Sequence, residues 1–455
     1  MNLTFYRYLN FRKMRLVLIA EVAVAALIVL IDASLGRPVW IDEFLHFCFG
    51  AMRSTAEAWQ VIKTSTKEVN HGQTGFYMLL DHWLLSSFGA SAVLLRLPSL
   101  ISGLLLFVST FYIFRLLGRV TWQVIALLAL LGQGTLIFFV GEARPYISLV
   151  AATVAVLAFY LVPPQERTGW TRSFGWFAAL FGVAMHPYFA VYWPALCLVS
   201  YVHHRITGQI TTGLRNALSY ADVLLCVVGA VFFMILSLET WLPGGPTFST
   251  DPFEFIGEPN IWVHFSGKAH FQFLRNHLIL ATAVTVVLIG WLVALPLPWR
   301  GSLLRLWPPF LLLAAALIIS LLLGYASYVR HYWILPRQWV ASAALVAIAV
   351  VWLWAEIAEA ASKRSRVLPV VLWALAFTAV FLQAAAIQRL KVVELVIYLS
   401  ASKSPDLPVS CDSNVVAPNT PDNDERNRLW VELANRNIAC GGKVWPVFRE
   451  YYGLK

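Results

Sequence analysis

Long runs of apolar residues recur along the chain, and they constrain its fold more than any other feature of the sequence. Most of these runs are close to the length of a helix that crosses the hydrocarbon core of a bilayer. Hydrophobic residues make up 59% of the 455 positions and charged residues only 13%, which excludes a soluble domain of this size. The sequence therefore predicts an all-α polytopic membrane protein with about eleven transmembrane helices. We place them at residues 16–35, 91–114, 120–140, 146–162, 173–187, 188–203, 219–239, 278–296, 308–325, 335–355 and 367–386.

Lysine and arginine residues predict the orientation of these helices. The basic residues of the short loops are concentrated in the segment before residue 16 and in alternate loops after it, as in cytoplasmic loops. We therefore expect a bacterial-type inner (plasma) membrane protein with a cytoplasmic N-terminus and a periplasmic C-terminus. Basic residues spread in this way mark topology and exclude a nucleic-acid partner. Three arginines on short exterior turns need another explanation: Arg144, Arg330 and Arg337.

The predicted domains follow from this arrangement. Residues 1–390 form a transmembrane catalytic domain with two long periplasmic loops, at 36–91 and 239–277. In the first loop, apolar residues recur at helical spacing among charged ones, which favours helices lying in the membrane interface. Residues 391–455 form a small periplasmic C-terminal segment, polar and rich in proline. It contains Cys411 and Cys440, which either form a disulfide or remain two thiols.

The first exterior loop carries an acidic pair, Asp42-Glu43, just after the first predicted span. If a helix begins there, Asp42 caps it and both acids favour its dipole, which is a purely structural role. His46 falls one turn after Asp42 on the same helix face. Two adjacent carboxylates with aromatic neighbours at a membrane boundary are also typical of a catalytic base.

Three other exterior segments carry reactive or charged groups. Glu142-Ala-Arg-Pro-Tyr146 is a turn between two spans, where Glu142 and Arg144 could simply pair with each other. His186 lies at another exterior helix end, where a lone histidine is more often part of the packing. Arg330, His331 and Arg337 lie among aromatic residues, where they either snorkel towards the interface or clamp an anion.

Carboxylates and cations on one face of a membrane protein favour sugar transfer from a lipid phosphate. The leaving polyprenyl phosphate is a weak base, so it needs its charge stabilised and needs no proton. The attacking hydroxyl needs a base, which a carboxylate supplies. One base without a general acid predicts a single displacement with inversion.

The motifs also resemble the polytopic GT-C glycosyltransferases, in the branch that contains protein O-mannosyltransferases and the lipid A aminoarabinose transferase. The resemblance covers residues 15–200 and, more loosely, the segment from Arg330 to Arg337. Its motifs are Asp42-Glu43, Leu80-Asp-His-Trp83, Leu95-Arg-Leu-Pro-Ser99, Glu142-Ala-Arg-Pro-Tyr146 and His186-Pro-Tyr188.

The resemblance implies Asp42 as the main catalytic carboxylate, with Glu142 assisting it. Two positions depart from the family pattern: Gly-Gln follows His71 in place of Pro-Pro, and the late Arg-Tyr pair is Arg330-His-Tyr332. Some members use a divalent metal ion and some do not, so the resemblance leaves a metal site open.

The predicted catalytic residues are Asp42, Glu43 and Glu142. The predicted donor-phosphate ligands are Arg330, Arg337, His71, Arg144 and His331. Further site candidates are His46, Tyr77, Tyr146 and His186. The predicted metal ligands are Asp42, Glu142 and His186.

The predicted function is transfer of a sugar from a polyprenyl-phosphate-linked donor to a hydroxyl of an envelope glycan, lipid or protein. The sequence identifies neither the sugar nor the acceptor. The first alternative is a transporter or flippase of a lipid-linked sugar, although transporters place their charges near the bilayer midplane. The second is a structural membrane protein in which the acidic loop is incidental.

Overall fold

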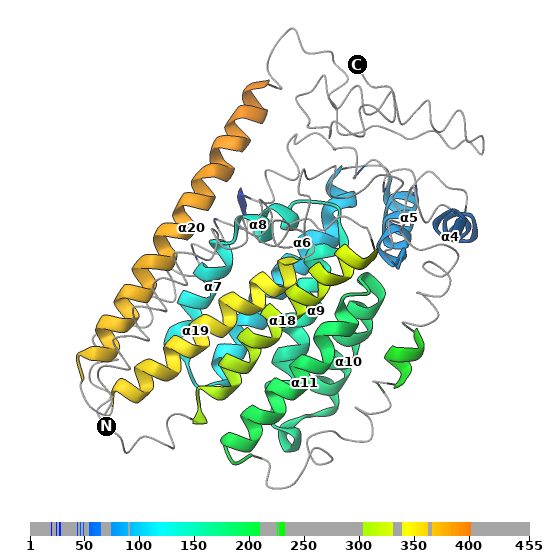
Figure 1. Cartoon of the computed structure of the whole chain (residues 1–455). Coiled ribbons are helices and arrows are strands. Elements are labelled where there is room, and N and C mark those ends of the chain that lie inside the picture. Colours follow the sequence, from blue (N-terminus) through cyan, green and yellow to red (C-terminus); the bar gives the residue numbers. More distant parts are fainter. Residues whose placement is uncertain are drawn as a thin grey trace.

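The computed structural model describes part of the chain. The described residues are 54–64, 74–89, 92–209, 227–232, 304–330, 339–362 and 366–401, with single positions at 20, 24, 27, 28, 43, 46, 49 and 225. All regular structure within them is helical, as the sequence predicts (Figure 1). The predicted all-α membrane class is thus confirmed.

The apolar runs form helices close to their predicted places. These are α6 (Ala92–Leu116), α9 (Pro145–Leu161), α10 (Gly169–Met185), α11 (Phe189–Ile206), α18 (Trp307–Arg330), α19 (Val340–Ser362) and α20 (Leu368–Ala401). By length and composition α6, α19 and α20 can each cross a membrane. The predicted spans at 16–35, 219–239 and 278–296 lie largely outside the described residues.

The core of the bundle is built on α9 and α19, whose side chains are almost all buried. Helices α6, α10, α11 and α19 pack around α9, while α7 (Gln123–Leu131), α18 and α20 pack against α19 (Figure 1). Gly175 lets α10 approach α9 closely, because a Cβ atom there would overlap the ring of Phe159. Large apolar side chains such as Leu104 on α6 and Leu382 on α20 are exposed, as suits helices that face lipid.

One predicted span is bent. Residues 120–140 form η2 (Val120–Trp122), α7 (Gln123–Leu131) and α8 (Gly134–Val140), with an 80° change of direction between α7 and α8. The Gly132 carbonyl, freed by the break, accepts a hydrogen bond of 2.8 Å from Gln383 Nε2 on α20. A broken helix is tolerated among apolar helices when a neighbouring helix satisfies its backbone in this way.

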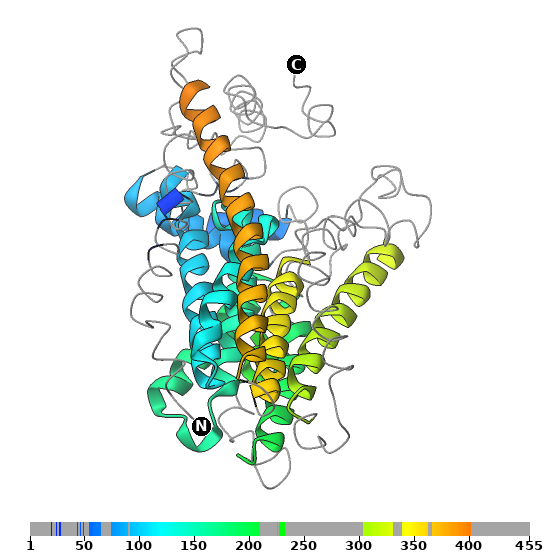
Figure 2. The same ribbon diagram turned by 90° about the vertical axis from the view of Figure 1, so that its left-hand side faces the viewer.

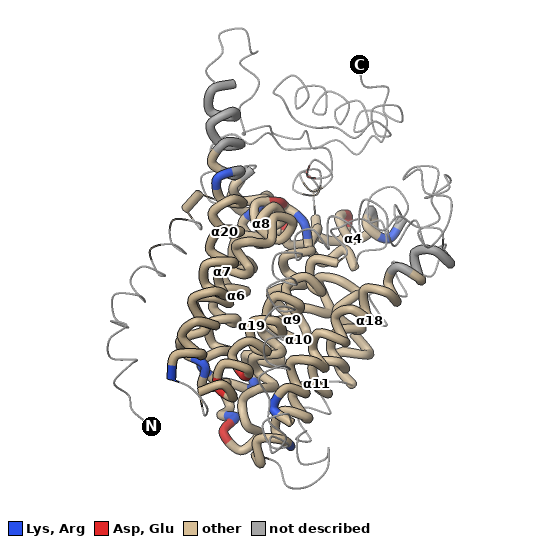
Figure 3. Tube along the Cα trace, turned by 60° about the vertical axis from the view of Figure 1, so that its left-hand side comes forward, with Lys and Arg blue, Asp and Glu red and all other residues tan. Residues whose placement is uncertain are grey.

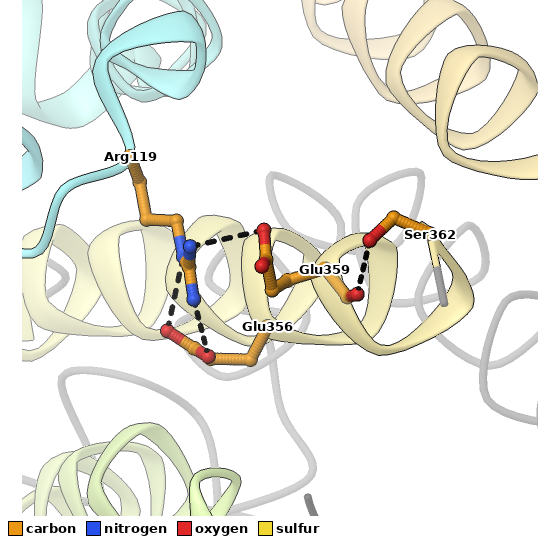
Figure 4. A network of polar contacts seen from close by, with 4 residues as sticks. All are labelled: Arg119, Glu356, Glu359 and Ser362. Carbon is orange, nitrogen blue, oxygen red and sulfur yellow. Dashed lines mark hydrogen bonds and ion pairs between the residues drawn. The ribbon is translucent and has the colours of Figure 1, made fainter. Parts of the chain in front are cut away.

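Charged residues gather at the two ends of the bundle, with apolar helices between them (Figure 3). At one end Arg119, which follows α6, donates to both oxygens of Glu356 on α19, at 3.3 and 2.9 Å (Figure 4). It also donates to Glu359 at 3.2 Å. We call this end of the bundle, where α6 ends, the far end. Arg96 lies near the start of α6, at the opposite end of the bundle.

The other end is the first-loop end, defined by the start of α6, the turn at residues 141–144 and the junction of α10 with α11. Two helices of the first loop, α4 (Thr55–Thr64) and α5 (Phe76–Phe88), pack there, with α5 against α6 and α10. Helix α20 returns to this end and runs on to Ala401, well past its predicted end at 386, so it projects beyond the other helices (Figure 2). The predicted C-terminal segment lies outside the described residues from 402 onward.

Candidate active site

The buried face of the first-loop segment consists of residues spaced three apart. Glu43, His46 and Phe49 are helical, and each is at most 1% exposed. This spacing places side chains on one side of a helix. Asp42, the predicted base, lies outside the described residues and directly precedes Glu43.

Glu43 is bound to two distant parts of the chain. Arg96, in the second turn of α6, donates from Nε to Oε1 at 2.9 Å and from a terminal nitrogen to Oε2 at 2.7 Å. Both side chains are 0% exposed. The backbone N–H of Ala143 donates to Oε1 at 2.9 Å. A carboxylate of the first loop therefore joins α6 to the turn between α8 and α9.

That turn carries two predicted site residues, Glu142 and Arg144, which are 0% and 1% exposed. The Arg144 N–H donates to the Glu142 carbonyl at 2.9 Å, and Arg144 is the N-cap residue of α9 with Pro145 in the first turn. Pro at this position suits a helix start, because its missing N–H has no partner within the helix. The Arg144 guanidinium lies over the Tyr146 ring, 5.9 Å from its centroid.

A second hydrogen-bonded chain reaches the same turn from α5. The Tyr77 hydroxyl lies 2.7 Å from Ser99 Oγ on α6, and Ser99 Oγ donates to the Arg144 carbonyl at 3.2 Å. Burial, together with the nearby charge of Asp81, raises the pKa of Tyr77 well above its usual value of 10.0. The Tyr77 hydroxyl therefore keeps its proton and can act as a donor.

Asp81, also on α5, pairs with His46. The distance from His46 Nδ1 to Asp81 Oδ2 is 2.6 Å, and both side chains are 0% exposed. Burial, and secondarily the charge of Glu43, raises the pKa of Asp81 well above 3.8. Its other oxygen, Oδ1, receives no hydrogen bond from any part of the chain that the structure describes.

Sequence reasoning missed Arg96 and Asp81. Both stand inside recognised motifs, Leu95–Ser99 and Leu80–Trp83, but neither was predicted as a site residue. An ionisable residue in an apolar run was the available signal, because such a residue has a buried partner by default.

His186 lies at the junction of α10 and α11, where its ring packs against Tyr146 at 5.6 Å and Tyr188 at 4.5 Å between centroids. The His186 Nδ1 accepts a hydrogen bond of 3.3 Å from the Tyr188 N–H. His186 thus belongs to an aromatic cluster next to the turn that carries Glu142 and Arg144.

The remaining predicted residues are placed only in part. Arg330 is the last residue of α18, which ends at the first-loop end. His71, His331 and Arg337 lie outside the described residues. Among described residues no group of three or more His, Cys, Asp or Glu side chains could hold a metal ion. Of the predicted metal ligands, Glu142 and His186 therefore form no such site by themselves, and Asp42 is not described.

Comparison with known proteins gives weak likenesses only. No protein-family model matches the chain. No curated protein sequence matches it significantly. The structure is similar to ArnT from Cupriavidus metallidurans bound to undecaprenyl phosphate, with a TM-score of 0.45, 18% identity, and coverage of 88% of this chain and 83% of that one. The apo form of ArnT gives the same TM-score with 17% identity and the same coverage.

A further likeness is to the Archaeoglobus fulgidus oligosaccharyltransferase in complex with Zn and sulfate. Its TM-score is 0.42 at 11% identity, covering 91% of this chain and 61% of that one. At TM-scores below 0.5 these likenesses carry no argument about what this chain binds or does.

The described side chains therefore form a buried polar cluster beneath the first loop. It contains three carboxyl groups, on Glu43, Asp81 and Glu142, and two guanidinium groups, on Arg96 and Arg144. A buried charge without a partner is costly, so removing one member of an ion pair in this cluster leaves the other destabilised. A charged ligand bound beside it would be held by groups that are already fixed in place.

Proposed function

We propose that the chain transfers a sugar from a polyprenyl-phosphate-linked donor to a hydroxyl of a cell-envelope glycan, lipid or protein. The observation that carries the proposal is the hydrogen bond from the Ala143 N–H to Glu43, 2.9 Å long across 100 residues. It joins the segment of the predicted acidic pair to the turn of Glu142 and Arg144. Acidic and cationic groups thereby meet at one end of an apolar bundle, as the reaction requires.

In the proposed reaction the acceptor hydroxyl attacks the anomeric carbon of the donor sugar. A new C–O bond forms to the acceptor while the bond from the anomeric carbon to the phosphate oxygen breaks. The Asp42 carboxylate takes the hydroxyl proton, and polyprenyl phosphate leaves as an anion. Attack opposite the leaving group inverts the anomeric configuration.

The other predicted residues support this displacement. Glu142 assists Asp42, and Arg330 and Arg337 bind the donor phosphate, with His71, Arg144 and His331 as further candidates. Arginine suits this task because its planar fork matches phosphate oxygens. The proposed setting is a bacterial-type inner membrane with the first-loop end in the periplasm. No step of the reaction is assigned to a metal ion.

The test is a transfer assay on the purified protein in nanodiscs. The donors are radiolabelled polyprenyl-phosphate-linked hexoses and pentoses, and the acceptor is a cell-envelope extract. We expect labelled acceptor and free polyprenyl phosphate in equal amounts. A flippase would move the donor across the bilayer with its sugar–phosphate bond intact, and a structural protein would do neither. Either result would contradict the proposal.

A further inference from the structure

Arg96 has no role in the proposed reaction, yet it is fully buried and bound to Glu43. We propose that Arg96 is a positioning residue: it fixes Glu43, which in turn holds the 141–144 turn against the first-loop segment that contains Asp42. This inference rests on the proposed function, because it concerns the geometry of the same site. It also changes the predicted role of Glu43 from catalysis to positioning.

The contacts of Glu43 support this role. Oε1 accepts from Arg96 Nε and from the Ala143 N–H, both at 2.9 Å, and Oε2 accepts from Arg96 at 2.7 Å. Three donors therefore hold the two oxygens, and two of them belong to a rigid guanidinium fork. To act as a base, Glu43 would have to release Arg96 inside a buried cluster. At 0% exposure its carboxylate is also shielded from substrate.

Stability alone does not explain the pair. A buried ion pair can often be replaced by well-packed apolar residues without loss of stability. The Ala143 N–H, however, is a buried donor that needs an acceptor in a defined place. Only a carboxylate or an amide at position 43 supplies that acceptor, and Arg96 determines the direction in which it points.

Helix α6 holds the turn at a second point. Ser99, three residues after Arg96 and so on the same side of α6, donates to the Arg144 carbonyl at 3.2 Å. The N–H of one turn residue and the carbonyl of the next are thus both tied to α6, the first through Glu43. Because the Ala143 N–H and the Arg144 carbonyl are both hydrogen-bonded, the backbone that carries Glu142 and Arg144 cannot rotate freely.

The test compares two neutral replacements of the pair. In E43Q/R96Q, two amides can bond to each other and leave a carbonyl oxygen for the Ala143 N–H. In E43M/R96M, an apolar pair of similar size offers no acceptor. We expect the amide pair to exceed the apolar pair in kcat by on the order of tenfold or more, with similar KM for the donor. Equal kcat values would overturn the proposal. Loss of kcat in both variants would overturn it too, since it would mean that the charge of Glu43 is itself required.

Amide hydrogen exchange gives a readout that does not depend on the reaction. A short peptide that covers residues 142–144 has few exchangeable amides, because the next residue, Pro145, has no N–H. Its exchange rate therefore reports mainly on the turn. We expect slow exchange in the wild type and in E43Q/R96Q, and fast exchange in E43M/R96M. Slow exchange in all three would overturn the proposal. If the wild type transfers no sugar, the proposed function fails while this comparison still tests the positioning of the turn.

A single substitution covers the case in which the apolar pair does not fold. R96K keeps the charge but loses the fork, so we expect lower kcat and faster exchange at 142–144. The matched control is R119K, the same change in an ion pair at the far end of α6. It should leave both quantities unchanged. Wild-type kcat and exchange in R96K would overturn the proposal.

Discussion

Removing Arg96 should destabilise the protein far more than removing Arg119, although each arginine forms an ion pair at one end of α6. Arg96 and Glu43 are both 0% exposed. Arg119 is 15% exposed, and its partners Glu356 and Glu359 are 8% and 45% exposed. In R96M the Glu43 carboxylate stays buried without its counter-charge, which costs about 3–5 kcal/mol. In R119M water can replace part of the lost contact, so the cost should be about 1–2 kcal/mol.

The free energy of unfolding can be measured by SDS titration in mixed micelles, with the fluorescence of the 19 tryptophans as the signal. A difference of about 1–4 kcal/mol between the variants corresponds to roughly a 5- to 900-fold difference in the folded-to-unfolded ratio. The double variant E43M/R96M is the control, because it removes both charges and should recover most of the loss. If R96M is no less stable than R119M, Glu43 is not a buried carboxylate that depends on Arg96 for its counter-charge.

Three further predictions concern charge, donor binding and metal. Because the pKa of Asp81 is raised in the folded protein, the folded state holds the Asp81 proton more tightly than the unfolded state does. The stability that this contributes is complete below pH 3.8, the ordinary pKa of the carboxyl, and is lost as the pH rises towards the raised pKa. D81N should therefore lose less stability than the wild type as the pH is raised from about 4 in the same SDS titration; parallel losses would contradict this. R330A and R337A should each weaken donor binding by roughly tenfold to 100-fold in a filter-binding assay with labelled donor. Unchanged binding in both would refute the arginine clamp. EDTA treatment followed by transfer assays tests whether a divalent metal is needed, which the family resemblance leaves open: lost activity that Mg²⁺ or Zn²⁺ restores shows that it is, and full activity after EDTA shows that it is not.

The helices at residues 92–206 and 307–386 could be predicted because burial in a bilayer leaves a direct mark on hydropathy. The bend between α7 and α8 was not predicted, although Gly132-Gln133-Gly134 interrupts the apolar run at the break. Glycine is common within transmembrane helices, and hydropathy does not report a change of direction. The partner that satisfies the break, Gln383, lies about 250 residues away in the sequence. Local pattern therefore predicted where helices form, and distant contacts decided how one of them turns.

For the site, the sequence indicated some of the residues but not the contacts that join them. Glu43, Glu142 and Arg144 stood out because charge is rare in an apolar chain and each lies beside a predicted span. Their connection through Arg96 and the Ala143 N–H depends on residues 53 and 100 positions from Glu43, which no local spacing reveals. Asp81 was overlooked for the same reason, since its partner His46 is 35 residues away. The catalytic and binding roles of all these residues remain predictions, and Asp42, His71, His331 and Arg337 also lie outside the described residues.

The most direct test of the proposed chemistry is sugar transfer by purified D42N in nanodiscs, measured beside the wild type. Asparagine keeps the size of the side chain but cannot take the proton of the acceptor hydroxyl. We expect kcat to fall by roughly 100-fold or more while binding of the labelled donor and the free energy of unfolding stay unchanged. Transfer by D42N at the wild-type rate would contradict the assignment of Asp42 as the base and, with it, the proposed mechanism.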